Sequence, residues 1–274
     1  MKQSLELDLK GKIAVITGGG GELCGRMAEV LAELGCAIAI LDFNEQKATA
    51  RAEKINSAGG RAIPLIADVT SRKSLEASAE EFKKHFDGLD ILINGAGGNH
   101  PDATTSKDKS FFELSEEAIR KVFELNILGT IFTSQVFGKI MLETRGEGVI
   151  INISSMNAFR PLTRIPAYSS AKSAVSNFTQ WLAVHFAQEY TPKIRVNAIA
   201  PGFFITEQNR FLLLDEKGEL TERGKKIIDH TPAGRFGKAD DLISTLLWLI
   251  SPASEFVSGV IVPVDGGFNA YSGV

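Results

Sequence analysis

Short apolar runs alternate with longer segments of helical periodicity along this 274-residue chain. The runs "IAVIT", "AIAILD", "DILIN" and "GVIINIS" are apolar on both faces, as strands of a parallel sheet covered on both sides must be. The alternation predicts seven strands, over 12–17, 37–42, 61–67, 89–94, 148–153, 193–199 and 260–264, and helices over 23–35, 44–58, 71–86, 115–144, 166–189, 206–214, 221–229 and 239–250.

No linker rich in Pro, Gly or Ser divides the chain, and it contains no internal repeats or low-complexity tracts. We therefore expect a single doubly wound, Rossmann-like α/β domain over 1–274, with a seven-stranded parallel sheet and a small substrate lid at about 203–235. Ligands of such sheets bind beyond the carboxyl ends of the strands. The residues that follow the predicted strands are polar or glycine-rich, which makes this edge the candidate site.

Composition and charge exclude several classes of protein. The formal net charge is −3 and the basic residues are scattered, which argues against a nucleic-acid partner. Two cysteines, Cys24 and Cys36, fit reduced thiols, and we expect no metal site. The first dozen residues lack the apolar core of a signal peptide, and no apolar run approaches the length of a membrane span. We expect a cytoplasmic protein with no membrane partner.

Three side chains suggest proton transfer. Tyr168 follows Ser155 by thirteen positions, and Lys172 lies four further on, on the same face of a predicted helix. A phenol with a pKa of about 10 shuttles protons poorly at neutral pH unless a nearby cation stabilises the phenolate. We expect Lys172 to lower the pKa of Tyr168, and Ser155 to hydrogen-bond the substrate oxygen. The alternative is that Tyr168 and Lys172 are ordinary surface neighbours.

These residues belong to an ordered set of motifs. "TGGGG", Asp68-Val69, "NGAG", "ELNILG", "NISS", "YSSAK", "RVNAIAPG" and "PVDGG" together resemble the short-chain dehydrogenase/reductase family from end to end. The resemblance implies an NAD(P)-dependent oxidoreductase that forms a homodimer or homotetramer.

The resemblance also implies a catalytic tetrad of Asn126, Ser155, Tyr168 and Lys172. In it, Tyr168 is the general acid and base, and Ser155 orients the substrate carbonyl. Lys172 lowers the pKa of Tyr168 and binds the nicotinamide ribose, while Asn126 supports a water relay from Lys172. For Asn126, a buried amide that bridges helix and sheet is the alternative reading and is compatible with that role.

The family pattern implies which residues bind the cofactor. Asp68 and Val69 would meet the adenine, and Thr206 the nicotinamide carboxamide, although Thr206 could instead be a helix N-cap. Asp42 ends the second predicted strand, where a carboxylate accepts hydrogen bonds from the ribose and repels a 2′-phosphate. No Arg or Lys stands beside Asp42 in the sequence or in the glycine loop, so NAD is favoured over NADP. The full set is Gly18, Gly21, Leu23, Asp42, Asp68, Val69, Asn94, Gly95, Ala96, Tyr168, Lys172, Pro201, Gly202 and Thr206.

The glycine loop "TGGGGELCG" departs from the family pattern T-G-x-x-x-G-x-G, because Glu22 and Cys24 replace two glycines. Such a loop binds pyrophosphate through backbone N–H groups at a helix N-terminus. We therefore expect Glu22 to point away from the phosphates and to cap the helix. On that basis Glu22→Gly should tighten the NAD Kd or leave it nearly unchanged.

The loops expected to line the substrate read "GGNHPDATTSKDKS", "MNAFRPLTRIPA" and "FFITEQNRFLLLDEKG". Arg160, Arg164 and Arg210 suit a substrate carboxylate, which a guanidinium can bind through two donors. Asn99, His100, Asn157 and Gln208 could hydrogen-bond sugar hydroxyls, although exposed loops are polar in any case. Loops this hydrophilic favour a small polyol acid over a steroid or a long acyl chain.

The same loops resemble the sugar-acid branch of the family that includes D-mannonate oxidoreductase, also called fructuronate reductase. The resemblance implies interconversion of D-fructuronate and D-mannonate with NAD. Three alternatives stay open: a gluconate 5-dehydrogenase-like enzyme, a reductase of the 3-ketoacyl type, and a non-catalytic protein that senses dinucleotides.

The two long predicted helices carry more apolar residues than one sheet face needs. The family uses these helices to form a dimer, commonly within a tetramer. A core formed wholly within one chain is the alternative. The residues concerned are Val122, Phe123, Phe132, Phe137, Phe178, Trp181 and Phe186.

Overall fold

The structure is a computed structural model that describes residues 7–207 and 209–273. Its strands pair in parallel in one seven-stranded sheet with the order β3-β2-β1-β4-β5-β6-β7. This confirms the predicted fold class. The strands are β1 Ile13–Thr17, β2 Ala37–Asp42, β3 Arg61–Ile66, β4 Ile91–Asn94, β5 Gly148–Ile153, β6 Ile194–Pro201 and β7 Ile261–Val264.

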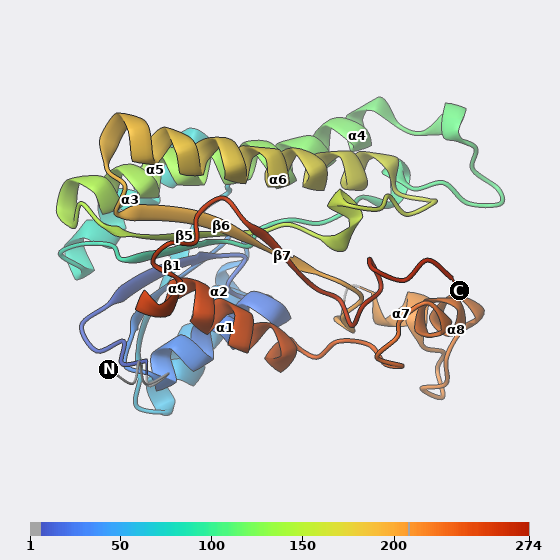
Figure 1. Cartoon of the computed structure of the whole chain (residues 1–274), viewed down its shortest axis with the longest axis horizontal. Helices are drawn as coiled ribbons and strands as arrows, with labels where there is room; N and C mark the ends of the chain where they lie inside the picture. Colours follow the sequence, from blue (N-terminus) through green and yellow to red (C-terminus); the bar gives the residue numbers. More distant parts are fainter. Residues whose placement is uncertain (1–6, 208, 274) are drawn as a thin grey trace.

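Helices cover both faces of the sheet (Figure 1). On one face α1, α2 and α9 bury an apolar core that includes Met27, Leu31 and Leu246. On the other face α3, α5 and α6 bury a second core that includes Phe82 and Phe137. The strand order reverses between β1 and β4, where the carboxyl ends open a crevice for ligands. The bounds are α1 Glu22–Glu33, α2 Glu45–Ser57, α3 Arg72–His85, α4 Glu116–Phe123, α5 Gly129–Thr144, α6 Pro166–His185, α7 Arg210–Leu213, α8 Glu222–Asp229 and α9 Ile243–Ile250.

The helix predicted over 115–144 is interrupted by a π-helical turn at Glu124–Leu128. The Asn126 amide donates to the Val122 carbonyl at 2.8 Å, and the Thr130 hydroxyl donates to the Asn126 carbonyl at 2.7 Å. Side-chain donors thus occupy carbonyls of the helix, and such competition favours an irregular turn. The turn places the Asn126 side chain against the loop that follows β4, where it bonds to Gly98.

By length and composition alone, Glu116–Thr144 could cross a membrane. This corrects the expectation that no run approaches the length of a membrane span. Packing explains the apolar composition, because half of the most apolar part of this segment is buried inside the protein. Phe137 and Met141, for example, lie in the core beneath this helix.

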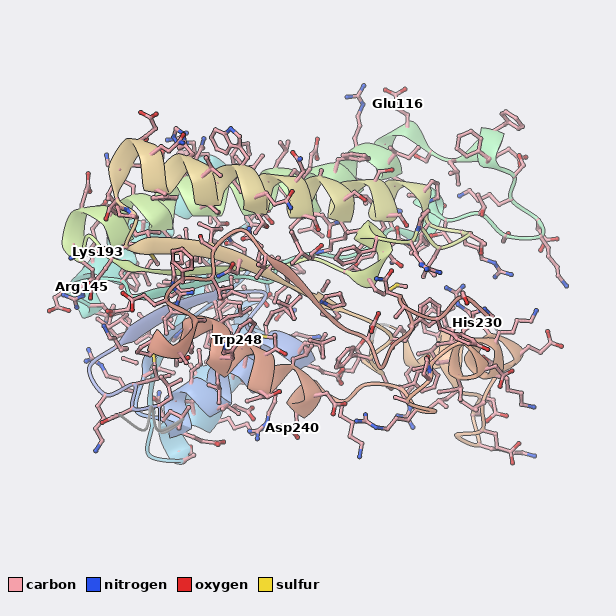
Figure 2. The ribbon with its side chains drawn as sticks, in the orientation of Figure 1. Glu116, Arg145, Lys193, His230, Asp240 and Trp248 are labelled. Atoms are coloured by element: carbon pink, nitrogen blue, oxygen red, sulfur yellow. The ribbon has the colours of Figure 1, made fainter. Side chains whose placement is uncertain are left out.

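The lid contains α7 and α8 and projects beyond the carboxyl edge of the sheet, beside the C-terminal tail (Figure 1). The predicted helix 206–214 is only the single turn Arg210–Leu213. The tail packs on the lid, because the ring centroids of Tyr271 and His230 are 5.7 Å apart. Figure 2 labels His230 in the lid. The predicted ends of two other helices are irregular: α6 continues as the π turn Phe186–Tyr190, and the 3-10 turn Ala239–Leu242 precedes α9.

Candidate active site

The glycine-rich loop between β1 and α1 forms a cradle of backbone groups. Gly18 has φ +64°, and a Cβ there would lie 3.1 Å from the Ala96 backbone nitrogen. Gly21 is the N-cap of α1, and no side chain caps that helix. The first N–H groups of a helix have no partner within it, so these are free to bind a phosphate. The loop therefore fits a dinucleotide pyrophosphate.

Thr17 and Cys24 join this loop to the end of β4. The Thr17 hydroxyl accepts hydrogen bonds from the Gly95 and Ala96 amides, both at 3.0 Å. A Cβ built on Gly95 would collide with the Cys24 sulfur and lie 2.9 Å from the Thr17 carbonyl oxygen. Cys24 can therefore replace the family glycine because Gly95 leaves room for its side chain. This pairing of Cys24 with Gly95 was not predicted from the sequence.

Glu22 does not cap α1, which corrects the expectation for its side chain. It is the first residue of the helix, and no side-chain cap is formed. Instead, Glu22 Oε2 accepts the backbone N–H of Glu207, in the lid, at 3.0 Å. An orphan amide of the lid is thus satisfied by a carboxylate of the glycine-rich loop region.

Asp42 lies at the end of β2 beside the glycine-rich loop. Its Oδ2 accepts the Gly20 amide at 3.1 Å, and its Oδ1 accepts the Asn44 amide at 3.0 Å. Two cations of α2 also reach this loop, which sequence adjacency did not reveal. A Cβ on Gly20 would lie 2.7 Å from the Lys47 Cβ, and Arg51 donates to the Gly21 carbonyl at 3.3 Å.

Both of these cations have acidic partners. Lys47 Nζ lies 3.4 Å from Glu207 Oε2, and Arg51 pairs with Glu29. The cations near Asp42 are therefore partly neutralised, and the Asp42 carboxylate remains the charge at the end of β2. Lys47 and Arg51 therefore do not place an unpaired positive charge beside Asp42, which agrees with the expected preference for NAD.

The remaining residues expected on the adenosine side form a supporting frame. Asp68 Oδ1 accepts the Thr70 amide and hydroxyl at 2.9 and 2.8 Å, within a turn. Val69 is buried, and its side chain would lie 2.8 Å from a Cβ on Gly129. The Asn94 amide nitrogen points into the protein and donates to Ser134 and Asn152. The Asn94 side chain therefore joins β4 to α5 and β5. Only the Asn94 backbone lies at the strand end where the cofactor is expected to bind.

Pro201 ends β6, and Gly202 continues along β7 by donating to the Val264 carbonyl at 3.0 Å. The N-cap of α7 is Asn209, so the alternative reading of Thr206 as a helix N-cap is wrong. Asn209 Oδ1 accepts the Thr206 amide at 2.8 Å, which fixes the backbone there. Within the described residues, the Thr206 hydroxyl has no protein partner.

Ser155 and Tyr168 meet at the carboxyl end of β5. Ser155 is buried at the start of a short 3-10 turn, Met156–Ala158, and Tyr168 comes from the first turn of α6. Burial raises the pKa of Tyr168, and a hydrogen bond with the Ser155 hydroxyl opposes that rise. The two hydroxyls are thus adjacent, as a proton relay requires.

Lys172 was expected to lower the pKa of Tyr168, but that pKa is raised in this arrangement. Its amine donates to the Ile153 carbonyl at 2.7 Å and lies 5.7 Å from the centroid of the Tyr168 ring. Burial lowers the pKa of Lys172 to about 8. The two groups share a face, as predicted, but burial dominates the pKa of each.

Asn126 anchors the loop that follows β4. Its amide accepts the Gly98 N–H at 3.2 Å and donates to the Gly98 carbonyl at 2.7 Å. A Cβ on Gly97 would lie 2.7 Å from Asn126 Oδ1 and 3.0 Å from Lys172 Nζ. Asn126 and Lys172 therefore both approach the backbone at Gly97. The bridging role considered for Asn126 is present, between helix and loop.

Sequence and structure comparisons identify the family. The model of the short chain dehydrogenase family matches residues 12–217. This chain belongs to that family. It is 50% identical over 279 residues to the uncharacterized oxidoreductase UxuB of Bacillus subtilis (strain 168), a match that covers 98% of this chain and 99% of the relative. The family assignment makes this chain an oxidoreductase that acts on alcohol groups.

Two further relatives have more specific names. The chain is 37% identical over 263 residues to the 2-dehydro-3-deoxy-D-gluconate 5-dehydrogenase of Dickeya dadantii (strain 3937), covering 96% of this chain and 97% of the relative. A Haemophilus influenza protein crystallised with bound NAD, and provisionally named a D-mannonate oxidoreductase, matches with a TM-score of 0.92 at 47% identity. That match covers 98% of this chain and 99% of the other.

Local turns occupy several residues that were expected to line the substrate site of this short-chain dehydrogenase. Asn99 donates to the Thr104 hydroxyl at 2.8 Å, and His100 Nδ1 accepts the Asp102 amide at 3.1 Å. Asn157 is buried next to Ser155, and its Oδ1 has no partner among the described residues. Gln208 lies outside the described residues.

The cations expected at the substrate side lie in two segments. Arg160 and Arg164 belong to the loop between β5 and α6, and Arg210 begins α7 in the lid. Arg160 donates to the Tyr271 carbonyl at 3.3 Å, so it binds the C-terminal tail. Neither Arg164 nor Arg210 forms an ion pair within residues 7–207 and 209–273.

Arg223, a half-buried cation in the first turn of α8, was not among the predicted site residues. Burial lowers its pKa, and the positive charge of Arg164 lowers it further. The two guanidinium groups, one in the β5–α6 loop and one in the lid, are therefore within electrostatic reach of each other. Among the described acids, none pairs with either of them. No periodicity or motif in the sequence distinguishes Arg223 from a surface cation.

Proposed function

We propose that this short-chain dehydrogenase uses NAD to interconvert a keto sugar acid and the corresponding hydroxy acid, with D-fructuronate and D-mannonate as the pair. Two observations support the substrate class: a structural neighbour that is 47% identical carries the name of a D-mannonate oxidoreductase, and the cations Arg164 and Arg223 repel each other with no acidic partner among the described residues. A ligand carboxylate between them would relieve that repulsion, because guanidinium groups bind carboxylates through paired donors.

The proposed cofactor fits the glycine-rich loop. Uncapped N–H groups at the start of α1 would hold the pyrophosphate, and Asp42 would accept hydrogen bonds from the ribose. Thr206 offers its hydroxyl to the nicotinamide carboxamide. A nicotinamide held there would supply the hydride to the substrate carbon in reduction and accept it in oxidation.

The side chains of this chain would then manage the proton. In the direction of reduction, the Tyr168 hydroxyl gives its proton to the substrate oxygen as that oxygen gains negative charge, and Ser155 donates a hydrogen bond to the same oxygen. In oxidation, the same groups remove the hydroxyl proton. Lys172, held by the Ile153 carbonyl, stabilises the resulting phenolate and binds the ribose. Asn126 keeps the Gly97–Gly98 backbone in place and is the proposed start of a water relay.

The test is NADH oxidation by the purified protein with D-fructuronate, and NAD reduction with D-mannonate. We expect Tyr168→Phe to lower kcat at least a hundredfold, since general acid–base groups contribute about 10²–10⁴. If wild type and Tyr168→Phe are equally active across a panel of hexuronates and aldonates, the protein is a dinucleotide-sensing relative and the enzymatic proposal fails.

Arg223→Ala tests the substrate carboxylate. We expect KM for the sugar acid to rise about tenfold or more, because a charged hydrogen bond contributes about 1.5–3 kcal/mol. Arg223→Lys keeps the charge but not the fork, and should fall between wild type and Arg223→Ala. An unchanged KM in both variants would remove Arg223 from the substrate site.

A second candidate follows from the Dickeya dadantii relative, which is 37% identical. Its substrate, 2-dehydro-3-deoxy-D-gluconate, is also a keto sugar acid and would meet the same cations. Comparison of kcat/KM for this compound and for D-fructuronate decides between the two. A 3-ketoacyl substrate in the same assay tests the remaining alternative.

We also propose a homodimer or homotetramer in the cytoplasm. Trp181, Val184 and Tyr190 are exposed along α6 and the turn that follows it, and Trp181 stacks on His185 with ring centroids 4.6 Å apart. Large exposed apolar side chains on one helix favour a protein interface. Light scattering tests this proposal, and a monomer would contradict it.

A further inference from the structure

Helix α1 contacts the lid at one point and the segment that follows the lid at another. At the start of the lid, Glu22 Oε2 accepts the Glu207 backbone N–H at 3.0 Å. Beyond its end, Arg26 Nε donates to Asp240 Oδ1 at 2.6 Å. Glu22 and Arg26 are four residues apart and share one face of α1. Asp240, labelled in Figure 2, lies before α9 on the same side of the sheet as α1 (Figures 1 and 2).

Residue 207 also touches the other side of the glycine-rich loop. The Glu207 carboxylate lies 3.4 Å from Lys47 Nζ, and the Lys47 side chain packs where a Cβ of Gly20 would lie. Glu207 therefore contacts Lys47 on one side of the glycine-rich loop and Glu22 on the other. The exposed ion pair contributes little, whereas the amide of Glu207 gains an ionised acceptor.

We propose that Glu22 is a positioning residue that holds the start of the lid, including Thr206, against the glycine-rich loop and thereby slows release of the bound dinucleotide. Thr206 directly precedes the residue that Glu22 binds. Glycine at position 22, the residue of the family pattern, could not make this contact. The inference rests on the proposed NAD binding.

The acceptor and the charge of Glu22 can be separated. Glu22→Gln keeps an oxygen acceptor and loses the charge, whereas Glu22→Gly loses both. Glu45→Gly is the matched control, because Glu45 is likewise the first residue of a helix, α2, and its side chain has no partner among the described residues. Circular dichroism of all three variants checks that the fold is retained.

Hydrogen exchange at the Glu207 amide, measured without cofactor, tests the contact itself. We expect exchange about fivefold faster in Glu22→Gly, a typical effect of losing one exposed hydrogen bond, and less than about twofold faster in Glu22→Gln and Glu45→Gly. Unchanged exchange in Glu22→Gly, or equal acceleration in Glu22→Gln, overturns the proposal. This measurement does not depend on the function of the protein.

Stopped-flow fluorescence of NADH release tests the consequence. The contact with Glu207 reverses the expectation from the sequence that Glu22→Gly tightens NAD binding or leaves it nearly unchanged. We expect the dissociation rate to rise about fivefold in Glu22→Gly and to stay within about twofold of wild type in the other two variants. Because Glu22→Gly and Glu22→Gln both lose the charge, their difference reports the acceptor. A release rate in Glu22→Gly that matches Glu45→Gly refutes the positioning role. Failure of wild type to bind NADH would instead refute the proposed cofactor.

Discussion

The space shared by Cys24 and Gly95 leads to a quantitative prediction. A methyl group at position 95 would overlap the Cys24 sulfur and lie 2.9 Å from the Thr17 carbonyl oxygen. Overpacking of this kind costs about 1–3 kcal/mol. We therefore expect Gly95→Ala to destabilise the protein by that amount. Gly98→Ala is the control in the same loop, because its Cβ would meet only Leu125 at 3.9 Å.

Cys24→Gly should also destabilise the protein by itself. The substitution places a glycine in α1, which costs about 1 kcal/mol relative to alanine, and it removes a buried side chain. The double variant loses the sulfur that Gly95→Ala would strike. The contact with Thr17 remains in both backgrounds and cancels in the comparison. The loss in the double variant should therefore be at least about 1 kcal/mol smaller than the sum of the single losses.

Thermal unfolding of the four proteins at one concentration measures this coupling. For a chain of this size 1 kcal/mol corresponds to a shift in Tm of about 2–4 °C, and a fixed concentration removes the effect of subunit association. A coupling below about 0.5 kcal/mol would mean that the two positions act independently. Cys24 would then not occupy the space that Gly95 leaves.

Three further predictions concern charge and assembly. Burial lowers the pKa of Lys172 from its ordinary 10.5 to about 8, so between these two pH values only the unfolded chain binds the proton. The free energy of unfolding should therefore rise with pH in this range, by up to about 1.4 kcal/mol per pH unit. Lys172→Met should lack this rise, and parallel curves of stability against pH for wild type and Lys172→Met would contradict the prediction. Asp42→Ala should shift the ratio of kcat/KM for NAD over NADP at least about tenfold towards NADP. The reason is that the Asp42 carboxylate repels the 2′-phosphate of NADP, and two charges about 4 Å apart interact by about 4 kcal/mol near a surface. An unchanged ratio would show that Asp42 does not discriminate between the two cofactors. Trp181→Glu should shift an assembled wild type to smaller species in light scattering, whereas no shift would place the interface elsewhere.

The sequence predicted the fold because its evidence is local and repeated. All five residues of β1 and all six of β2 are buried, which explains why these runs are apolar on both faces. The interruption at Glu124–Leu128 could not be predicted from periodicity, since it arises from hydrogen bonds of Asn126 and Thr130 to helix carbonyls. The sequence predicted a longer helix than α7 because the residues over 206–214 follow a helical pattern. Contacts outside the helix can determine the structure of such residues in a lid.

The residues of the candidate site that belong to a sequence motif could be predicted. Contacts between segments that lie far apart in the sequence could not. Ser155 and Tyr168 were placed correctly as neighbours, but the pKa of Tyr168 depends on burial, which spacing does not reveal. Lys47 reaches the glycine-rich loop from α2, and Arg223 approaches Arg164 from α8. Such contacts depend on how helices pack, and a single sequence contains no direct record of that packing.

The departures at positions 22 and 24 show that the glycine pattern of the family reflects steric constraints. A glycine is required only where a neighbour comes too close for a Cβ. Here Gly95 leaves the room that Cys24 fills, Gly25 leaves the room that Arg51 enters, and Glu22 points to the lid. Each departure therefore has its own compensating neighbour. Restoring the family glycines at 22 and 24 should not improve this protein, because it would empty one packed site and release one lid contact.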